Sequence, residues 1–433
     1  MTVARVDLWG RAIGAVSWDE EKELASFEYE PDFAESGIQV APQRMPLSNQ
    51  IYSFPNLPRE TFYGLPGLLA DSLPDDFGNA LINAWLAKQG RSPADFNAVE
   101  RLCYTGNRGM GALEYFPTTG PVKTESAYVD IDLLVELASE ILTARANLHG
   151  SFDPSKLENS LQDILRVGTS AGGARAKAII AWNPETDEVR SGQLAAESSF
   201  SYWLLKFDGV SGNKDKELED AAGFGLIEYA YYKMATAAGI KMSECRLLEE
   251  SGRNHFMTKR FDRTDSGGKI HMQTFSAMEH LDFNQVGAHS YEQALLTIRK
   301  LGMPMESIEE QFRRMVFNIV ARNQDDHVKN IAFLMDKTGT WSLSPAYDMT
   351  YSYNPSGAWT SKHQMTLNGK RDVFELEDFK ACAKTISMKR GRAERILKEV
   401  QEKVSDWKKF AKDVGVDKNS ANAIGKSHRI NIL

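Results

Sequence analysis

The sequence predicts an α+β fold with a β-rich N-terminal region, a mixed middle region and a mostly helical C-terminal region. Short strand patterns punctuated by Pro and Gly dominate residues 1–150. Residues 151–260 combine a glycine-rich loop, two strands, a helix and a last strand. In residues 261–433, apolar residues recur mainly at helical spacing. These three ranges are the domains that we expect.

The N-terminal region ends in one clear helix, which we expect over Tyr128 to Ala146. Its apolar residues recur at helical intervals, at Ile131, Leu134, Leu137 and Ile141. No catalytic constellation is visible in this region.

The middle region has apolar strands on both sides of its helix. We expect these strands over Ala178 to Trp182, Ser201 to Phe207 and Phe256 to Phe261. The helix is expected over about Leu218 to Ala238, because Gly239 is a common helix stop. It carries Glu228, which would either pair with Lys206 or face solvent.

The C-terminal region contains two kinds of helix signal. Ser290 and Gln293 form a capping box before a helix that Gly302 closes. Apolar spacing predicts two further helices, over Glu306 to Ala321 and over Ala393 to Val414. The apolar run Ile331 to Met335 predicts a buried strand.

Composition restricts the classes of function. The chain has 433 residues, of which 42% are hydrophobic and 25% charged, ordinary values for a globular protein of two or three domains. Three widely spaced cysteines, Cys103, Cys245 and Cys382, argue against a disulfide framework or a zinc site. The N-terminal residues lack the apolar core of a signal peptide, and no stretch reaches membrane-spanning length. We therefore expect a cytoplasmic protein without membrane contact.

The charge of the chain argues against direct binding of nucleic acid. The formal net charge is -8, so the surface as a whole should repel polyanions. One local exception is the basic run Lys384, Lys389, Arg390, Arg392 and Arg395. This run would be either the solvated face of a helix or a contact to nucleic acid.

The segment 323–330, with the sequence N-Q-D-D-H-V-K-N, has the residue types of a phosphotransfer centre. Asp325 and Asn330 have the spacing of the kinase pattern D-x-x-x-x-N, in which the Asp orients a hydroxyl and the Asn binds metal. A second carboxylate, Asp348, follows a strand, a turn and a strand, where kinases hold magnesium. A polar cluster between an apolar helix and an apolar strand would be costly to bury without partners.

Two other interpretations fit the same segment. Asn, Asp and His are also ordinary residues of turns and helix ends. Asp325, His327 and Asp348 would suit a metal-dependent hydrolase, because carboxylate and imidazole groups bind hydrolytic metals. The glycine and lysine features upstream favour the kinase interpretation.

Small residues dominate the run V-G-T-S-A-G-G-A-R-A-K at 167 to 177, and they would let backbone amides approach phosphate oxygens. The run is not a Walker A loop, because Ala174 and Arg175 follow Gly173. Taken alone it would be a flexible connection. Lys206 lies inside an apolar strand, where a lysine is rarely buried without a carboxylate or phosphate partner. A strand lysine after a glycine loop is the kinase order.

With these motifs the chain resembles the HipA-type toxin kinases of bacterial toxin–antitoxin modules. The resemblance is carried by the glycine run at 167 to 177, Y-W-L-L-K-F at 202 to 207, K-R-F-D-R at 259 to 263, N-Q-D-D-H-V-K-N at 323 to 330 and S-P-A-Y-D at 344 to 348. It extends to L-L-A-D-S-L-P-D-D-F-G at 68 to 78 and G-N-R-G-M-G-A-L-E-Y-F at 106 to 116. The resemblance implies a bilobal protein-kinase-like fold with an N-terminal β-rich subdomain and a mostly helical C-terminal lobe.

The resemblance also implies roles for single residues. Asp325 would be the catalytic Asp, and Asn330 and Asp348 would bind Mg2+. The residues that it places around ATP are Gly172, Gly173, Ala174, Arg175, Ala176, Lys177, Lys206, Lys259, Arg260, Phe261, His327, Val328, Lys329, Asn330, Tyr347 and Asp348. Ser170, or its neighbour Thr169, would be the autophosphorylated hydroxyl. Some relatives have Gln and Glu where this chain has Arg175 and Ala176, so its phosphate contacts would differ.

The implied activity is transfer of the ATP γ-phosphoryl group to a serine or threonine of a translation component, such as an aminoacyl-tRNA synthetase. A small DNA-binding antitoxin would neutralise the enzyme, and DNA would be contacted only through that complex. Two alternatives stay open: a regulatory corepressor with weak kinase activity, and a kinase of a small metabolite. The intact set of Asp325, Asn330, Asp348 and Lys206 argues against the corepressor.

Overall fold

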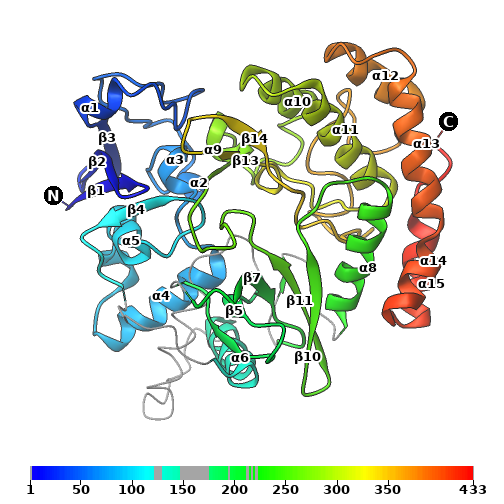
Figure 1. The fold of residues 1–433 in the computed structure, drawn as a ribbon, viewed down its shortest axis with the longest axis horizontal. Coiled ribbons are helices and arrows are strands. Elements are labelled where there is room, and N and C mark those ends of the chain that lie inside the picture. Colours follow the sequence, from blue (N-terminus) through cyan, green and yellow to red (C-terminus); the bar gives the residue numbers. More distant parts are fainter. Residues whose placement is uncertain are drawn as a thin grey trace.

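The computed structural model describes residues 2–120, 129–146, 175–193, 196–210, 214–215, 218–219 and 223–432. Within these residues the predicted α+β class is confirmed, with sheets in the first two regions and mostly helices after residue 275 (Figure 1). The domain boundaries at 150 and 260 stay predictions.

An antiparallel four-stranded sheet forms the N-terminal region, in the order β3-β2-β1-β4. Its strands are β1 (Thr2–Leu8), β2 (Arg11–Asp19), β3 (Leu24–Tyr29) and β4 (Leu113–Phe116). Ala4 and Val6 of β1 are fully buried while Arg5 between them is exposed, which is the pattern of a sheet with one face on a core. The connecting helices are α1 (Pro31–Ala34), α2 (Arg59–Phe62), α3 (Gly67–Ala70), α4 (Asp76–Lys88), the 3-10 turn η1 (Pro93–Asp95) and α5 (Ala98–Thr105).

A five-stranded antiparallel sheet forms the middle region, in the order β10-β11-β7-β5-β6. Its strands are β5 (Lys177–Trp182), β6 (Val189–Ser191), β7 (Ser201–Lys206), β10 (Cys245–Glu250) and β11 (Arg253–Lys259), and a separate hairpin pairs β8 (Lys214–Asp215) with β9 (Leu218–Glu219). The helix α8 (Phe224–Ala237) packs against β10 and β11. Helices α4 and α6 (Ile131–Ala146) bring Phe77, Leu81 and Ile131 into one core with Trp203 and Leu205 of the sheet.

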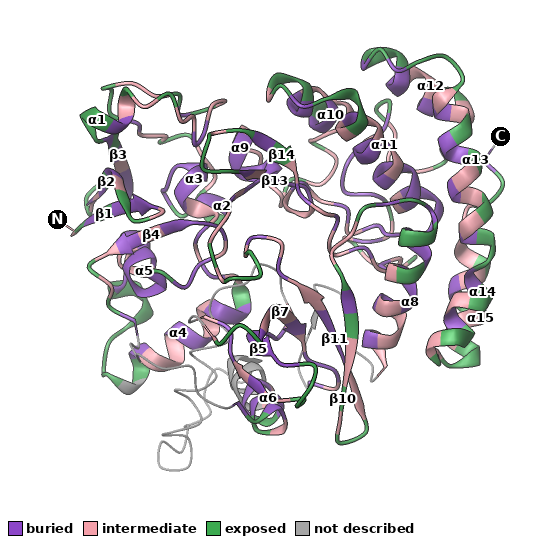
Figure 2. Cartoon of the chain, in the orientation of Figure 1, coloured by how far each residue is buried: buried purple, intermediate pink, exposed green. Residues whose placement is uncertain are grey.

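The C-terminal lobe is built around α11 (Met305–Val320), whose Phe312, Met315 and Ile319 are fully buried. A small sheet of β12 (His271–Thr274), β13 (Ala332–Met335) and β14 (Trp341–Leu343) lies between this lobe and the N-terminal region (Figure 1). The other helices are α9 (Phe275–Glu279), α10 (Tyr291–Lys300), the turn η2 (Val328–Asn330), α12 (Leu376–Thr385), α13 (Arg392–Ser405), α14 (Trp407–Val414) and α15 (Lys418–Ser427). Figure 2 shows that α12, α13 and α15 turn exposed faces outward and keep buried faces toward the lobe.

Several predicted helix ends are confirmed. Ser290 and Gln293 form the expected capping box, in which each side chain accepts from the backbone N–H of the other residue. Gly239 and Gly302 have left-handed φ values of +83° and +75°, which glycine adopts at little steric cost. The described helices include none that is long and apolar enough to cross a membrane.

Two predicted elements of the middle region have different bounds in the structure. The helix expected from Leu218 begins at Phe224, because Leu218 and Glu219 form β9 and Gly223 has a left-handed φ of +95° that interrupts a helix. The strand expected to reach Phe261 ends at Lys259. The next residue, Arg260, still donates its backbone N–H to Tyr202 O of β7 at 2.8 Å, and its side chain pairs with Asp262 beyond the strand.

The predicted helix from Ala393 to Val414 is in fact two helices, α13 and α14, which are separated at Asp406. The break turns Trp407 inward, where its ring lies 5.1 Å from the ring of Tyr231 on α8. Burial of this large indole compensates for the interrupted helical hydrogen bonds.

Candidate active site

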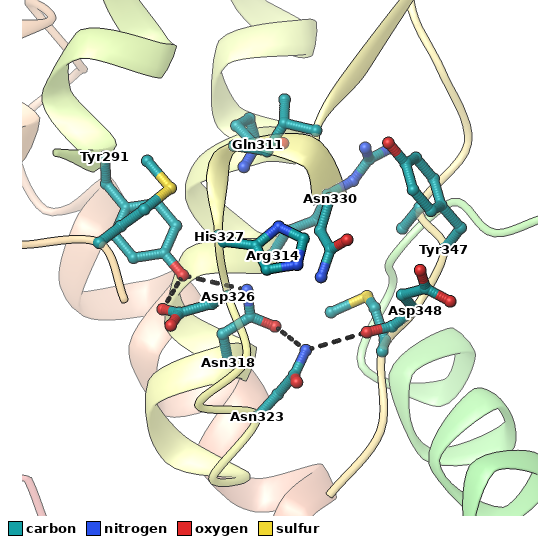
Figure 3. A pocket seen from close by; sticks show the side chains of 14 residues that line it. Tyr291, Gln311, Arg314, Asn318, Asn323, Asp326, His327, Asn330, Tyr347 and Asp348 are labelled. Carbon is teal, nitrogen blue, oxygen red and sulfur yellow. Dashed lines mark hydrogen bonds between the residues drawn. The ribbon is translucent and has the colours of Figure 1, made fainter. Parts of the chain in front are cut away.

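The loop between α11 and η2 carries the predicted catalytic residue, Asp325. After α11 ends, Arg322 takes a left-handed backbone conformation with a φ of +59°, which turns the chain away from the helix axis. Asn323 fixes the start of the loop, because its Nδ2 atom donates to Asn318 Oδ1 at 2.9 Å and to the backbone oxygen of Asp348 at 3.3 Å (Figure 3). The side chain of Asp325 remains 22% exposed.

Asp325, His327 and Asn330 meet at the end of this loop. Asn330 Nδ2 donates to the backbone oxygen of Asp325 at 2.8 Å, so the five-residue spacing closes a tight turn. His327 Nε2 lies 3.9 Å from Asp325 Oδ2. Trp359 Nε1 donates to Asp325 Oδ1 at 2.7 Å. The loop therefore presents a carboxylate, an imidazole and an amide close together.

The neighbouring residue, Asp326, is buried and anchors the loop. It accepts hydrogen bonds from Tyr291 Oη at 2.5 Å, from His363 Nδ1 at 2.7 Å and from the backbone N–H of Gln364 at 2.7 Å. His363 Nε2 accepts from Arg429 Nη1 at 3.1 Å, because arginine can only donate. These donors satisfy a carboxylate that would otherwise be costly to bury.

Residues near position 430 close over the start of the loop. The backbone N–H of Arg429 donates to Val320 O at 2.8 Å, and Arg322 Nε donates to Ser427 O at 2.8 Å. These bonds tie the C-terminal residues to the start of the segment that holds Asp325 and Asp326, and the contact between Arg429 and His363 links them to Asp326 through His363.

Lys206, at the end of β7, forms two short ion pairs. Its Nζ atom lies 2.6 Å from Glu228 Oε1 on α8 and 2.6 Å from Asp348 Oδ1. Burial alone would lower the pKa of Lys206, but the charges of Asp348 and Glu228 outweigh burial and raise it. Burial works against ionisation of Asp348 as well, and Lys206 outweighs it, so the pKa of Asp348 is lowered. Of the two positions considered for Glu228, the one paired with Lys206 is confirmed.

Two basic residues at the start of β5 lie beside these ion pairs. Arg175 stacks on Phe224, with Cζ 3.7 Å from the ring centre, and its Nη1 lies 4.0 Å from Glu228 Oε2. Lys177 is buried, and its Nζ lies 3.0 Å from Oδ2 of Asp75, the N-cap residue of α4. Burial raises the pKa of Asp75 to about 6, although the charge of Lys177 opposes the shift. Between them, Ala176 is fully buried.

The N-terminal region also lies beside Lys329. The Lys329 ammonium is 4.2 Å from the centre of the Phe283 ring. Burial lowers the pKa of Lys329, and the negative charges of Asp71 and Asp75 oppose that shift. Asp71 is held in place by Thr274, whose backbone N–H and Oγ1 donate to it at 2.6 and 2.8 Å. The segment 68–78 is therefore packed against the catalytic loop.

The resemblance implies that Lys259 to Phe261 form a hinge that receives adenine, and the structure uses the charged side chains of this hinge within the fold. Lys259 Nζ pairs with Asp265 at 2.8 Å. Arg260 is 4% exposed and donates two hydrogen bonds to Asp262, at 2.8 and 2.7 Å. Asp262 also accepts from the backbone N–H of Gly111 at 2.7 Å, which joins the hinge to the N-terminal region. Any contact of Lys259 or Arg260 with a nucleotide is thus left to backbone groups.

Aromatic contacts link the hinge to the catalytic loop. The ring centres of Phe261 and Tyr347 are 5.6 Å apart, and Tyr347 Oη donates to Lys329 O at 2.5 Å. Val328, between His327 and Lys329, is buried and packs as a core residue.

A small pocket opens where these parts meet (Figure 3). Its walls include His327 and both predicted metal ligands, Asn330 and Asp348. Toward α11 it is lined by buried polar side chains, among them Gln311 and Arg314. The structure thus brings His327, Asn330, Tyr347 and Asp348 together around the pocket. Lys206 lies beside them, because it is paired with Asp348.

Five predicted site residues lie outside the described residues: Thr169, Ser170, Gly172, Gly173 and Ala174.

Three residues of the site were missed by the sequence analysis. Asp75 was overlooked because its region carried no catalytic pattern, although the acidic pair after L-L-A-D-S-L-P was a usable signal. Asp326 was not singled out, because its neighbour Asp325 is the residue with the kinase spacing to Asn330. Trp359 lies in an irregular segment without periodicity, and its contact with Asp325 spans 34 residues.

Family models match most of the chain. The model described as "HipA-like C-terminal domain" matches residues 169–408, which is more than half of the chain. The chain belongs to the HipA family. The model described as "HipA N-terminal domain" matches residues 4–116, which contain the four-stranded sheet of this HipA-family chain.

Two proteins of Sinorhizobium fredii (strain NBRC 101917 / NGR234) are similar to this HipA-family chain. "Putative kinase Y4mE" is 23% identical over 368 residues, covering 81% of this chain and 77% of that protein. "Putative kinase Y4dM" is 26% identical over 172 residues, covering 36% of this chain and 39% of that protein.

A solved structure has the same fold. HipA of Shewanella oneidensis MR-1, in a toxin–antitoxin complex with HipB and operator DNA, matches with a TM-score of 0.66 and 16% identity. The match covers 98% of this chain and 94% of that chain. The predicted fold of a HipA-type protein, with its sheet-rich N-terminal region and helical C-terminal lobe, is confirmed.

Proposed function

We propose that the chain is an ATP-dependent kinase that phosphorylates serine or threonine hydroxyls of a protein. The observation that carries this proposal is the bridge that Lys206 makes between Glu228 on α8 and Asp348. In kinases, the strand lysine paired with a helix glutamate holds the ATP phosphates, beside the Asp that binds magnesium. Family membership supports the proposal, and both Sinorhizobium relatives carry the word kinase in their names.

The residues present fit Mg2+ held together with ATP. Asn330 would offer its amide oxygen, because its Nδ2 atom already donates to Asp325 O. Asp348 would offer Oδ2, because Oδ1 binds Lys206. Two protein oxygens and the phosphate oxygens suit Mg2+, and the described residues contain no cluster of three His, Cys, Asp or Glu that would form a metal site without nucleotide. When bound, Mg2+ would neutralise charge on the phosphates.

Asp325 would act as the base in this reaction. The oxygen of the substrate hydroxyl forms a bond to the γ-phosphorus, and the bond from that phosphorus to the β,γ-bridging oxygen breaks. ADP leaves with the electron pair, and the hydroxyl proton passes to the Asp325 carboxylate. Lys206 would hold phosphate oxygens in place throughout.

We further propose that the kinase acts as a toxin controlled by a small DNA-binding antitoxin. The fold match to a HipA that is bound to HipB and operator DNA supports this proposal. The net charge of -8 favours contact with DNA through the antitoxin and not through the bare chain. A translation component such as an aminoacyl-tRNA synthetase would be the substrate.

Purified chain incubated with Mg-ATP and cell lysate should transfer labelled phosphate to a protein, and its overproduction should arrest growth. The matched control is Asp325→Asn, which keeps the shape of the side chain and should do neither. If transfer occurs to a small metabolite and growth is unaffected, the toxin proposal is wrong. If neither protein nor metabolite is labelled, the kinase proposal is wrong.

A further inference from the structure

We infer that Trp359 is a positioning residue for the catalytic carboxylate: its indole N–H fixes Asp325 Oδ1 and so presents Oδ2 to the substrate hydroxyl. This inference rests on the proposed kinase function. The donor and acceptor atoms are 2.7 Å apart, a short distance for a hydrogen bond from nitrogen to a carboxylate. Asp325 Oδ2 lies on the side of His327, whose Nε2 is 3.9 Å away.

The segment that carries Trp359 is bound to the residues on both sides of Asp325. Gln324 Nε2 donates to Thr360 O at 3.1 Å. Gln364 Nε2 donates to Trp359 O and, at 3.3 Å, to Gln324 O. Because these residues are immediate neighbours in the two segments, the indole cannot shift far without breaking bonds to the catalytic loop.

A second set of bonds fixes the other end of the same segment. Asp326 accepts from the backbone N–H of Gln364 and from His363 Nδ1, each at 2.7 Å. Gln324, Asp326, His363 and Gln364 are all buried. Trp359 itself is half-buried.

Two consequences for the chemistry follow from the nature of this donor. An indole N–H only donates, so Trp359 can orient Asp325 but cannot receive the substrate proton. A hydrogen bond to the charged form of a carboxylate also favours that form, which is the form that accepts a proton. Removing the N–H should therefore loosen the carboxylate and make it a less effective proton acceptor.

The test is Trp359→Phe, which removes the N–H and keeps an aromatic ring. The matched control is Trp341→Phe, since Trp341 Nε1 donates to Gln39 O at 3.1 Å, far from Asp325 in the small sheet. We expect Trp359→Phe to lower kcat by about 10- to 100-fold with little change in KM for ATP. Trp341→Phe should leave both kcat and KM unchanged.

A readout that does not need activity separates this inference from the kinase proposal. The carboxyl carbon of Asp325 can be followed by NMR with 13C-labelled aspartate and assigned with Asp325→Asn. A changed chemical shift of this carbon at constant pH in Trp359→Phe, but not in Trp341→Phe, would support the inference even if the wild-type chain transferred no phosphate. An unchanged shift in both variants, or an unchanged kcat in Trp359→Phe of an active enzyme, would overturn it.

Discussion

The two carboxylates of the candidate active site differ in what holds them. Asp348 is bound by the ammonium of Lys206, and its charge is thereby favoured over burial. Asp325 is bound by the neutral N–H of Trp359, and its backbone oxygen by Asn330. Asp348 is therefore part of a fixed charge cluster, while the carboxylate of Asp325 accepts a hydrogen bond from a neutral donor.

This difference leads to opposite expectations for the two Asp→Asn variants. Asp325→Asn should keep the affinity for Mg-ATP and lower phosphotransfer by about 100- to 10,000-fold, because the proton acceptor is lost. Asp348→Asn should weaken Mg-ATP binding itself, because a metal ligand and a partner of Lys206 are lost together. Calorimetric titration with Mg-ATP and a single-turnover transfer assay separate the two effects. Equal transfer rates in wild type and Asp325→Asn would show that another residue is the base.

A second expectation at the residue scale concerns Ser170. A phosphate there adds roughly 1.5 to 2 negative charges to the glycine run that is expected to approach ATP phosphates, and repulsion should lower nucleotide affinity. Incubation with Mg-ATP should add about one phosphate per chain, mapped to Ser170 by mass spectrometry of the intact protein and its peptides.

Ser170→Ala provides the control for this switch, since it should bind ATP and stay unmodified at that position. A phosphate found outside residues 167 to 177, or an unchanged affinity of the modified form, would contradict the switch without affecting the kinase proposal.

Single residues differ in how far the sequence could reveal them. Asp325, Asn330 and Asp348 were predictable because a dense polar run between apolar segments is costly unless it has a use. The pairing of Lys206 followed from one charge in an apolar strand. Trp359 gave no such signal, because an aromatic residue in an irregular loop fits either surface or core.

Among the elements, α4 and β5 are joined by a buried ion pair. Asp75 caps α4 by accepting from Gly78 N–H at 2.7 Å, and it also pairs with Lys177 of β5. The side chains of the pair are 6% and 3% exposed. This ion pair thus connects the N-terminal region to β5, the strand after the glycine run. Removing one partner of a buried ion pair is strongly destabilising.

Asp75→Asn tests this connection, because Asn caps a helix about as well as Asp while removing the charge. We expect the free energy of unfolding at pH 7.5 to fall by about 2 to 4 kcal/mol, since the buried Lys177 loses the charge of Asp75. Asp417→Asn is the matched control, because Asp417 is an exposed N-cap residue of α15, with an expected loss below about 1 kcal/mol. Urea unfolding of both variants measures the difference. Equal losses would mean that the ion pair contributes nothing.

Local sequence patterns predicted most helices and strands. They failed where packing between segments that are far apart in the sequence determines the bounds of an element. The capping box at Ser290 was predictable because it is set by residues three positions apart. The break at Asp406 was not, because the apolar face continues through it and the cause is the space that α8 offers to Trp407. The start of α8 was misplaced because the hairpin of β8 and β9 precedes it.

At the scale of the whole molecule, buried histidines make the fold sensitive to acid. Burial lowers the pKa of His255, His271, His280 and His428, each to about 4. Unfolding returns these rings to water, where they bind protons near pH 6.5. Their contribution to stability is therefore complete above about pH 6.5 and is lost as the pH falls toward 4. Asp75, with its pKa raised to about 6, acts in the opposite direction over part of this range.

We expect the free energy of unfolding to fall steeply between about pH 6.5 and 4.5, with each such histidine contributing on the order of 2 kcal/mol by pH 5. His271→Gln should reduce the slope, because the unfolded chain then gains one proton fewer. Gln273→Leu is the control, since Gln273 is buried two residues along β12 and does not titrate. It should shift stability equally at every pH. Urea unfolding at a series of pH values checks both, and identical slopes in wild type and His271→Gln would contradict the expectation.

The contacts of Arg429 with His363 and Val320, beside the loop that carries Asp325, restrict when the site can be completed during synthesis of the chain. A ribosome working along the message has made every predicted site residue once it passes Asp348, and domains generally fold from the N-terminal side first. Yet the bonds from Arg429 to His363 and to Val320 can form only some eighty codons later. We expect the nascent chain to carry an unfinished catalytic loop until then. A protein that would phosphorylate the machinery of translation thus gains these contacts well after its predicted site residues have been made.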